Sequence, residues 1–269
     1  MKISYLMYEP VPQLQELAGR IERVAGLGYQ GIELVATHPM GYAIDELVAL
    51  TRKHKLPVVS LLSGWSYANE GLCLSSPDAG VRERAVERLR EYVGMAAQLG
   101  AIMVVGLMQG LRSDEPDEAK ANDRIAEALK LVAETAHVER VQVVLEPVNH
   151  LQVGFNHTAG EAAALVARVG SPALGYMLDT IHMNIEEHSV LETIRAHGPC
   201  IRHFHLCETN GSAYGTGNLD FPSVLAALAQ AGYDRYASVK VYRKANWEEA
   251  ARSSAEFLRQ CGIAWSPAG

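Results

Sequence analysis

Long apolar runs are missing from this sequence. No stretch approaches the ~18 to 20 consecutive apolar residues that a membrane helix needs, although 48% of the 269 residues are hydrophobic. The first residues, MKISYLMYEP, contain one early Lys and an apolar run too short for the hydrophobic region of a signal peptide. We therefore expect a cytoplasmic protein with no membrane partner.

Cysteine pairs and a surplus of positive charge are also missing. The four cysteines show no CxxC spacing, which argues against a zinc ribbon or a redox pair and indicates ordinary reduced thiols. The net charge of −7 and the pI near 5.8 lack the basic balance of a protein that binds nucleic acid. These properties favour a small-molecule ligand and no nucleic-acid partner.

No linker rich in Pro, Gly or Ser, and no block of like charge, divides the chain. A chain of 269 residues with this apolar content can bury one large core. Barrels of the (β/α)8 type, with roughly 250 residues, do so as one domain. We therefore expect a single domain over residues 1–269.

Eight apolar segments are typical of buried strands, and eight helical patterns alternate with them. In the pattern over 81–99, for example, apolar residues recur at steps of three and four. This alternation predicts the α/β class and a (β/α)8 TIM barrel. The expected strands are 2–8, 31–36, 57–63, 101–108, 141–147, 174–179, 201–208 and 236–242, and the expected helices are 14–27, 44–54, 81–99, 125–137, 159–169, 190–196, 222–231 and 247–258.

Helix-end signals support this division. Thr158 followed by Glu161 fits a capping box, and Gly100 fits the end of the helix over 81–99. Ser76 and Pro77 fit the N-cap and first turn of that same helix.

The last four expected strands each carry a polar residue at or near their carboxyl end. The intervals between these residues are 33, 26 and 35 positions, about the length of one strand, helix and return. Because the carboxyl ends of barrel strands form one face, we expect the side chains to meet there. They are Glu146, Asp179, His205 and Lys240.

Other residues are candidates for substrate binding. Glu33 is a carboxylate within an apolar strand, so it is either a site residue or a charge satisfied by its neighbours. Trp65 lies in the loop over 64–74, where specificity is expected. Asn210 and Tyr214 lie in the loop over 208–221, whose glycines fit either a phosphate site or tight turns.

Two carboxylates and an imidazole that converge make a site for a divalent ion. The oxygen-rich set favours Mn or Mg over a thiolate-type zinc site. Such an ion beside a hydroxy-ketone polarises the carbonyl and stabilises an enediolate, while a nearby base moves the neighbouring proton.

The sequence resembles the xylose isomerase-like TIM barrels, in the sugar isomerase and epimerase branch that includes D-tagatose 3-epimerase and 5-keto-L-gluconate epimerase. The resemblance covers nearly the whole chain. Its motifs are LEPVN (145–149), LDTIHMNIEE (178–187), FHLCETN (204–210), GNLDF (217–221) and GLCLSSPDAGVRERAVERL (71–89).

The resemblance implies roles for particular residues. Glu146, Asp179 and His205 match three ligands of a divalent metal, which would be Mn, Mg, Co or Zn. Glu146 also matches one of two catalytic acid/base carboxylates, and His182 matches a substrate contact.

The sequence departs from the family pattern at four positions. Lys240 stands where these epimerases place a fourth metal ligand and second catalytic carboxylate. Gly211 stands where a substrate-contacting Arg is frequent, Asn218 where a His is common, and Gln152 where a Glu often contacts substrate. The two-carboxylate mechanism therefore cannot be carried over whole.

Lys240 changes the charge count of the site. Three carboxylates and a divalent ion sum to −1, and Glu146, Asp179 and a protonated Lys240 reach the same −1 without an ion. Adding the ion would give +1, and a unit charge about 4 Å from a divalent one costs roughly 8 kcal/mol at an effective dielectric of about 20. Lys240 therefore replaces the metal as counter-charge, loses its proton or points away.

We expect an isomerase or epimerase that acts on a small keto sugar or sugar acid. The substrate could carry a phosphate group or lack one. We also expect a homo-oligomer, either a dimer or a tetramer. Glu146 would move a proton, and Lys240 would be its acid/base partner or an electrophile; a Schiff base through Lys240 is the less favoured role. Two other classes stay open: a non-catalytic or metal-free sugar-binding barrel, and, less favoured, a metal-dependent endonuclease acting at abasic DNA sites.

Overall fold

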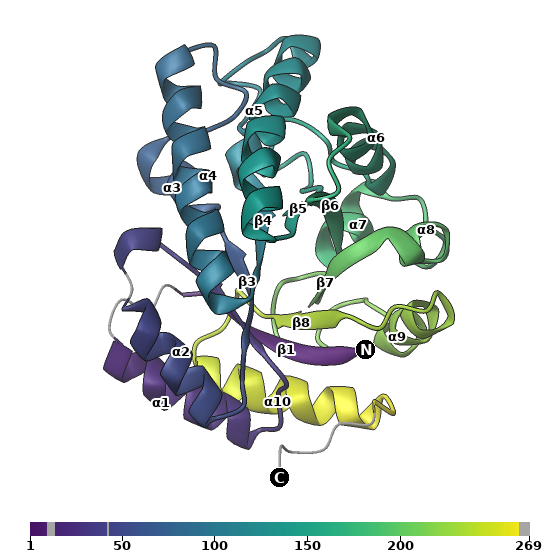
Figure 1. Cartoon of the computed structure of the whole chain (residues 1–269). Coiled ribbons are helices and arrows are strands. Elements are labelled where there is room, and N and C mark those ends of the chain that lie inside the picture. The colour runs from purple at the N-terminus through teal and green to yellow at the C-terminus, as the bar shows by residue number, and fades with distance from the viewer. Residues whose placement is uncertain (10–13, 42, 264–269) are drawn as a thin grey trace.

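Eight parallel strands close into a barrel and follow one another around it in chain order, with the last strand paired to the first (Figure 1). The structure is a computed structural model that describes residues 1–9, 14–41 and 43–263. The predicted fold, a single-domain (β/α)8 TIM barrel, is confirmed. The strands are β1 (Lys2–Met7), β2 (Ile32–Val35), β3 (Val58–Leu62), β4 (Ile102–Val105), β5 (Val143–Leu145), β6 (Leu174–Asp179), β7 (Ile201–Cys207) and β8 (Tyr236–Lys240).

Helices connect the strands and lie around the outside of the barrel (Figure 1). None of the helices in the described ranges combines the length and the apolar character needed to cross a membrane. They are α1 (Leu14–Gly26), α2 (Ile44–Lys53), α3 (Trp65–Glu70), α4 (Ala79–Leu99), α5 (Glu118–Glu139), α6 (Ala159–Val169), α7 (Thr180–Glu186), α8 (Val190–His197), α9 (Phe221–Gln230) and α10 (Trp247–Gln260), with the 3-10 turns η1 (Pro39–Gly41), η2 (Leu107–Gln109) and η3 (Gly198–Cys200).

The outer helices bury one face each, as their apolar spacing predicts. In α4 the fully buried residues include Ala85, Leu89, Tyr92 and Ala96, which recur at steps of three and four. The helix ends where Gly100 adopts a left-handed conformation, φ +67°. Burying this face against the barrel is what holds the helix in place.

Two local features differ from the sequence-based expectation. The N-cap of α4 is Asp78 and not Ser76, because the Asp78 carboxylate accepts hydrogen bonds from the Gly80 and Val81 N–H groups. The short helices α3 and α7 were not expected. α7 begins directly after β6 because Asp179, the last residue of the strand, accepts from the Ile181 N–H at 3.0 Å and caps the helix.

The barrel interior contains polar side chains that reach across from strand to strand. Ser4 on β1 and Ser238 on β8 lie 2.5 Å apart through their hydroxyl oxygens, and the Ser238 hydroxyl lies 3.4 Å from His203 Nε2 on β7. All three side chains are buried. Parallel barrels usually fill this space with branched apolar residues, so a polar interior here calls for internal hydrogen-bond partners.

The predicted capping box at the start of α6 is confirmed, and it provides a test of local stability. Thr158 accepts from the Glu161 N–H, and the Glu161 carboxylate accepts from the Thr158 N–H. We expect Thr158→Ala to lower the free energy of unfolding by about 1 kcal/mol, because it leaves a helix-end N–H unpaired. Urea denaturation measures this loss. Thr135→Ala, at a half-buried position of α5 away from the helix ends, is the control and should change the free energy of unfolding by less than about 0.5 kcal/mol.

Candidate active site

The four polar residues at the strand ends converge, as their spacing predicts. His205 Nδ1 lies 3.4 Å from Glu146 Oε1 and 3.3 Å from Asp179 Oδ2. Lys240 Nζ donates to Asp179 Oδ2 at 2.6 Å and lies 3.9 Å from Glu146 Oε1. All four side chains are buried, and Asp179 and His205 are opposite each other in the register of β6 and β7. Lys240 therefore points into the cluster and not away from it.

His182 joins this cluster from the first turn of α7. Its Nε2 lies 3.8 Å from both Glu146 Oε1 and Asp179 Oδ2, and its Nδ1 lies 2.7 Å from the amide nitrogen of Asn149. Because that amide nitrogen is a donor, Nδ1 accepts and Nε2 carries the proton. The Nε2–H group is thus aimed toward the carboxylates. Burial lowers the pKa of His182, which keeps the ring neutral.

The charges of the cluster depend on one another. Burial alone would raise the pKa of Asp179 and Glu146, but the ammonium of Lys240 outweighs it and the pKa of both carboxyls is lowered. Burial alone would lower the pKa of Lys240, but the two carboxylates outweigh it and the pKa is raised. The structure therefore holds two carboxylates and one ammonium in direct contact.

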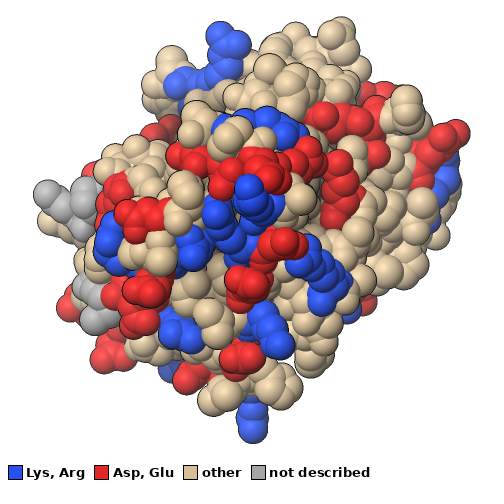
Figure 2. Space-filling view, turned by 90° about the horizontal axis from the view of Figure 1, so that it is seen from above, with Lys and Arg blue, Asp and Glu red and all other residues tan. Residues whose placement is uncertain are grey.

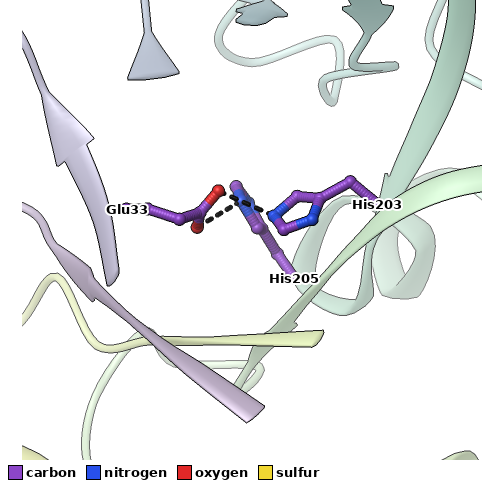
Figure 3. A group of neighbouring side chains, drawn as sticks. All are labelled: Glu33, His203 and His205. Atoms are coloured by element: carbon purple, nitrogen blue, oxygen red, sulfur yellow. Dashed lines mark hydrogen bonds and ion pairs between the residues drawn. The ribbon is translucent and has the colours of Figure 1, made fainter. Parts of the chain in front are cut away.

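Glu33 binds two histidines from inside the barrel (Figure 3). Its Oε1 lies 2.7 Å from His203 Nε2, and its Oε2 lies 3.0 Å from His205 Nε2. The three side chains are almost completely buried. Burial opposes a charge on His205, but Glu33 and the cluster carboxylates raise the pKa of this ring well above its usual range. Glu33 thereby directs His205 Nδ1 toward Glu146 and Asp179.

The buried His, Glu and Asp groups are consistent with a metal site. Glu146 Oε1 and His205 Nδ1 are buried and make no hydrogen bond among the described residues, as expected of atoms that face an ion. Two ligand atoms that are about 2.1 Å from one ion at a tetrahedral angle lie about 3.4 Å apart, which the separations at His205 match. Glu146, Asp179 and His182 also form a compact potential ligand group. The Lys240 ammonium, however, lies against the same two carboxylates.

A cavity of about 190 Å³ opens onto the cluster at the carboxyl ends of the strands. Glu146, His182 and Lys240 supply its charged and imidazole groups, and Trp65 forms part of its rim. Most of the remaining wall is apolar, which suits a small ligand held by a few directed polar contacts. The full lining is Tyr8, Val35, Leu62, Ser63, Gly64, Trp65, Ala68, Val104, Gly106, Leu107, Glu146, Val148, Gln152, His182 and Lys240.

Three of the candidate substrate-binding residues do not line this cavity. Glu33 lies beneath the cluster, with its carboxylate taken by two histidines. Asn210 donates to Thr216 within its own loop. Tyr214 is buried, stacks on Phe221 with ring centroids 4.2 Å apart, and donates to the Leu206 carbonyl. Their placement gives no support to direct contact with substrate.

The glycine-rich loop is organised around the buried carboxylate of Glu208. This side chain accepts from the backbone N–H groups of Thr209, Gly215 and Leu219. A bound phosphate would need backbone N–H groups of this kind as hydrogen-bond donors. In this loop they already donate to the Glu208 carboxylate. The glycines thus serve close packing, since a Cβ at Gly217 would lie 2.4 Å from Glu208 Oε1.

Gly211 fits its position because the ring of Tyr242 fills the space beside it. A Cβ there would lie 2.2 Å from the Tyr242 ring, and the backbone is left-handed at φ +69°. An Arg side chain at this position would meet the same ring. The residue that position 211 can hold therefore depends on Tyr242.

Fold and cluster together define a class: a parallel barrel with carboxylates, imidazoles and one ammonium at its strand ends. A family model described as xylose isomerase-like TIM barrel matches residues 21–261. The chain belongs to the xylose isomerase-like TIM barrel family, in its ketose 3-epimerase branch. The expected enzyme class, a sugar isomerase or epimerase, is confirmed at the level of the family.

Similar proteins define this branch. The L-ribulose 3-epimerase of Mesorhizobium japonicum is 37% identical over 163 residues, 60% of this chain and 54% of that protein. The D-psicose 3-epimerase of Agrobacterium fabrum is 31% identical over 79% of this chain and 75% of that protein. A solved structure of L-ribulose 3-epimerase has a TM-score of 0.85 at 25% identity, over 97% of this chain and 94% of that one. The chain thus matches about half the length of the first relative and three quarters of the second.

Sequence reasoning missed three residues of the site. His203 lies two positions before His205, so the alternation of a strand places both rings on the same face, and this signal was available. Asn149 lies in the LEPVN motif but carries no local sign that it would meet His182. Tyr8 reaches the cavity from the loop after β1.

The contacts of Glu33 predict a large effect on stability. We expect Glu33→Ala to lower the free energy of unfolding by about 3 to 5 kcal/mol, because two buried imidazoles would lose their common partner. Ser60→Ala is the matched control, since this buried hydroxyl on the neighbouring strand has no hydrogen-bond partner among the described residues. Chemical denaturation compares the two, and equal losses would contradict the assigned role.

The Gly211 contact predicts non-additive substitutions. Gly211→Ala should lower the free energy of unfolding by about 2 to 4 kcal/mol, because the backbone is left-handed there and the new methyl group would clash with Tyr242. Gly232 has a similar φ of +71° but open space around it. Gly232→Ala should therefore lower the free energy of unfolding by only about 1 to 2 kcal/mol. Adding Tyr242→Ala to Gly211→Ala should recover part of the loss in a double-mutant cycle. Strictly additive effects would show that the ring is not the obstacle.

Proposed function

We propose that the protein is a sugar epimerase that acts on a small unphosphorylated ketose and inverts the carbon next to the carbonyl. The observation that carries this proposal is that Glu146, His182 and Lys240 face one small cavity at the strand ends. The names of the similar proteins, L-ribulose 3-epimerase and D-psicose 3-epimerase, support the substrate class and carbon 3 as the reacting centre. The occupied amides of the loop around Glu208 support a sugar without phosphate.

Glu146 is the base in this proposal. Its carboxylate is ionised beside Lys240 and borders the cavity, so it can accept a proton from a bound sugar. Removing the proton next to a ketone leaves negative charge on the carbonyl oxygen. Inversion then requires that a water molecule in the cavity give a proton to the opposite face of the same carbon, and protonated Glu146 returns its proton to the hydroxide that remains. Proton transfer by a positioned carboxylate contributes about 10² to 10⁴ in rate.

Lys240 is the electrophile. Among the described residues, the Lys240 side chain donates one hydrogen bond, to Asp179 Oδ2 at 2.6 Å, so the ammonium keeps N–H groups for an oxygen in the cavity. Two groups that approach one carbon from opposite faces at about 3 to 3.5 Å would lie roughly 6 to 7 Å apart. The 3.9 Å between Lys240 Nζ and Glu146 Oε1 therefore favours charge stabilisation over proton transfer on the opposite face.

His182 and the metal ligands complete the proposed site. The His182 Nε2–H group is oriented by Asn149 and can donate to a hydroxyl of the sugar. Glu146, Asp179 and His205 would hold a divalent ion, and Mn, Mg, Co or Zn would suit the oxygen and imidazole set. When bound, such an ion acts as a Lewis acid on the carbonyl oxygen.

The short distance between Glu146 and Lys240 also favours a second candidate function. A single base that moves a proton along one face of an enediol interconverts an aldose and a ketose without a donor on the opposite face. The 3.9 Å separation fits such a one-base isomerase. Products distinguish the two, since an epimerase inverts one centre of a ketose and an isomerase yields an aldose.

Other classes have less support. A metal-dependent endonuclease would need a basic track for DNA, but the net charge is −7, and Lys and Arg lie among Asp and Glu on the face in Figure 2. Titration with an abasic duplex at low salt should therefore show no binding. A non-catalytic sugar-binding barrel would be favoured if ketoses raised the melting temperature and none were converted.

The test is incubation with free ketopentoses and ketohexoses in D2O, with and without added Mn²⁺. We expect deuterium at the inverted carbon of the product, observed by NMR. Glu146→Gln should lower turnover by at least 10², because the amide cannot accept the proton. Glu134→Gln, on the exposed face of α5, is the control and should keep full turnover.

Lys240→Met should also lower turnover by about 10² to 10³, because the charge that stabilises the developing oxyanion is lost. Its effect should appear in kcat more than in KM. Full turnover of both Lys240→Met and Lys240→Glu on the true substrate would remove Lys240 from the mechanism.

A further inference from the structure

The Lys240 ammonium contacts the two carboxylate oxygens that a metal ion would use. Asp179 Oδ2 lies 2.6 Å from Lys240 Nζ and 3.3 Å from His205 Nδ1. Glu146 Oε1 lies 3.9 Å from Lys240 Nζ and 3.4 Å from His205 Nδ1. The ammonium and an ion held by Glu146, Asp179 and His205 would therefore share the same oxygens.

Burial makes this sharing unfavourable for an ion. Asp179 has no exposed surface, Glu146 is 7% exposed and Lys240 is 8% exposed, so little water screens the charges. The two carboxylates and the ammonium sum to −1, and a divalent ion would change this to +1 with two cations side by side. Binding the ion must therefore displace the ammonium from Asp179 or overcome the repulsion.

The ammonium lies between the strand neighbour of Lys240 and the cavity. Lys240 is the last residue of β8, and its neighbour in the register of β7 is Cys207, which is buried. Its side chain borders the cavity, so an ammonium displaced from Asp179 can enter the space proposed for the substrate. An ion and a substrate would then compete through Lys240.

We propose that Lys240 is a built-in cation that competes with divalent ions for Glu146 and Asp179, so that this site binds such ions weakly and needs none to neutralise its carboxylates. The proposal rests on the proposed function in taking these residues as the active site. It predicts that the charge at position 240 controls metal affinity. A methionine there removes the competing charge, and a glutamate adds a ligand as well.

The experiment measures metal binding in the absence of sugar. Full-length protein is treated with EDTA, freed of the chelator and titrated with MnCl2, and free Mn²⁺ is followed by electron paramagnetic resonance. The matched control is Lys244→Met, which also removes a largely buried ammonium, one that lies 2.7 Å from Glu9 and donates to the Val241 carbonyl. Circular dichroism checks that each variant is folded.

We expect Lys240→Met to bind one Mn²⁺ per chain at least tenfold more tightly than the wild type, and Lys240→Glu to bind it more tightly still. Lys244→Met should match the wild type. The proposal is overturned if the wild type binds Mn²⁺ as tightly as Lys240→Met, or if neither variant at position 240 gains affinity.

If both variants at position 240 fail to fold, the Mn²⁺ titration of the wild type alone tests the proposal. Saturation of one site per chain with a Kd below about 1 µM would overturn the proposal, and binding weaker than that would support it. These Mn²⁺ titrations do not depend on enzyme activity. A protein that converts none of the ketoses but shows the expected metal affinities would therefore contradict the proposed function and leave this inference intact.

Discussion

Buried negative charge at the centre of the barrel is the constraint on which the site depends. Glu33, Glu146 and Asp179 are all removed from water, and each would be strongly destabilising without a positive or donating group beside it. His205 lies between all three of them, and Lys240 lies against two. The orientation of every catalytic candidate therefore follows from how this chain pairs its charges.

Local patterns were enough to predict the architecture and the centre of the candidate site. Apolar runs that alternate with helical patterns identified the strands, and the intervals between Glu146, Asp179, His205 and Lys240 placed these side chains on one face. This works because a parallel barrel repeats one unit, so spacing along the chain translates into position around the ring. The capping box at Thr158 was likewise readable, because it is formed within four residues.

Contacts between distant segments could not be predicted in the same way. Glu33 pairs with His203 across 170 positions, and Tyr214 packs edge-on against Phe257, with ring centroids 5.9 Å apart. The sequence offers a carboxylate in a strand and an aromatic residue in a loop, and both are equally compatible with a ligand. Only the folded structure shows whether such a group already has a hydrogen-bond or packing partner within the protein. For the same reason, the sequence left open whether the Lys240 side chain points into the cluster or away from it.

The contact between Gly211 and Tyr242 bears on how this chain could have diverged from its relatives. With the tyrosine ring in place, an arginine at position 211 has no room, whereas a smaller residue at position 242 would be neutral with respect to a glycine at 211. Substitutions at the two positions can therefore accumulate in one order and not in the other. In a chain that carries Tyr242, a large side chain at position 211 therefore becomes possible only after the ring has been replaced or has moved.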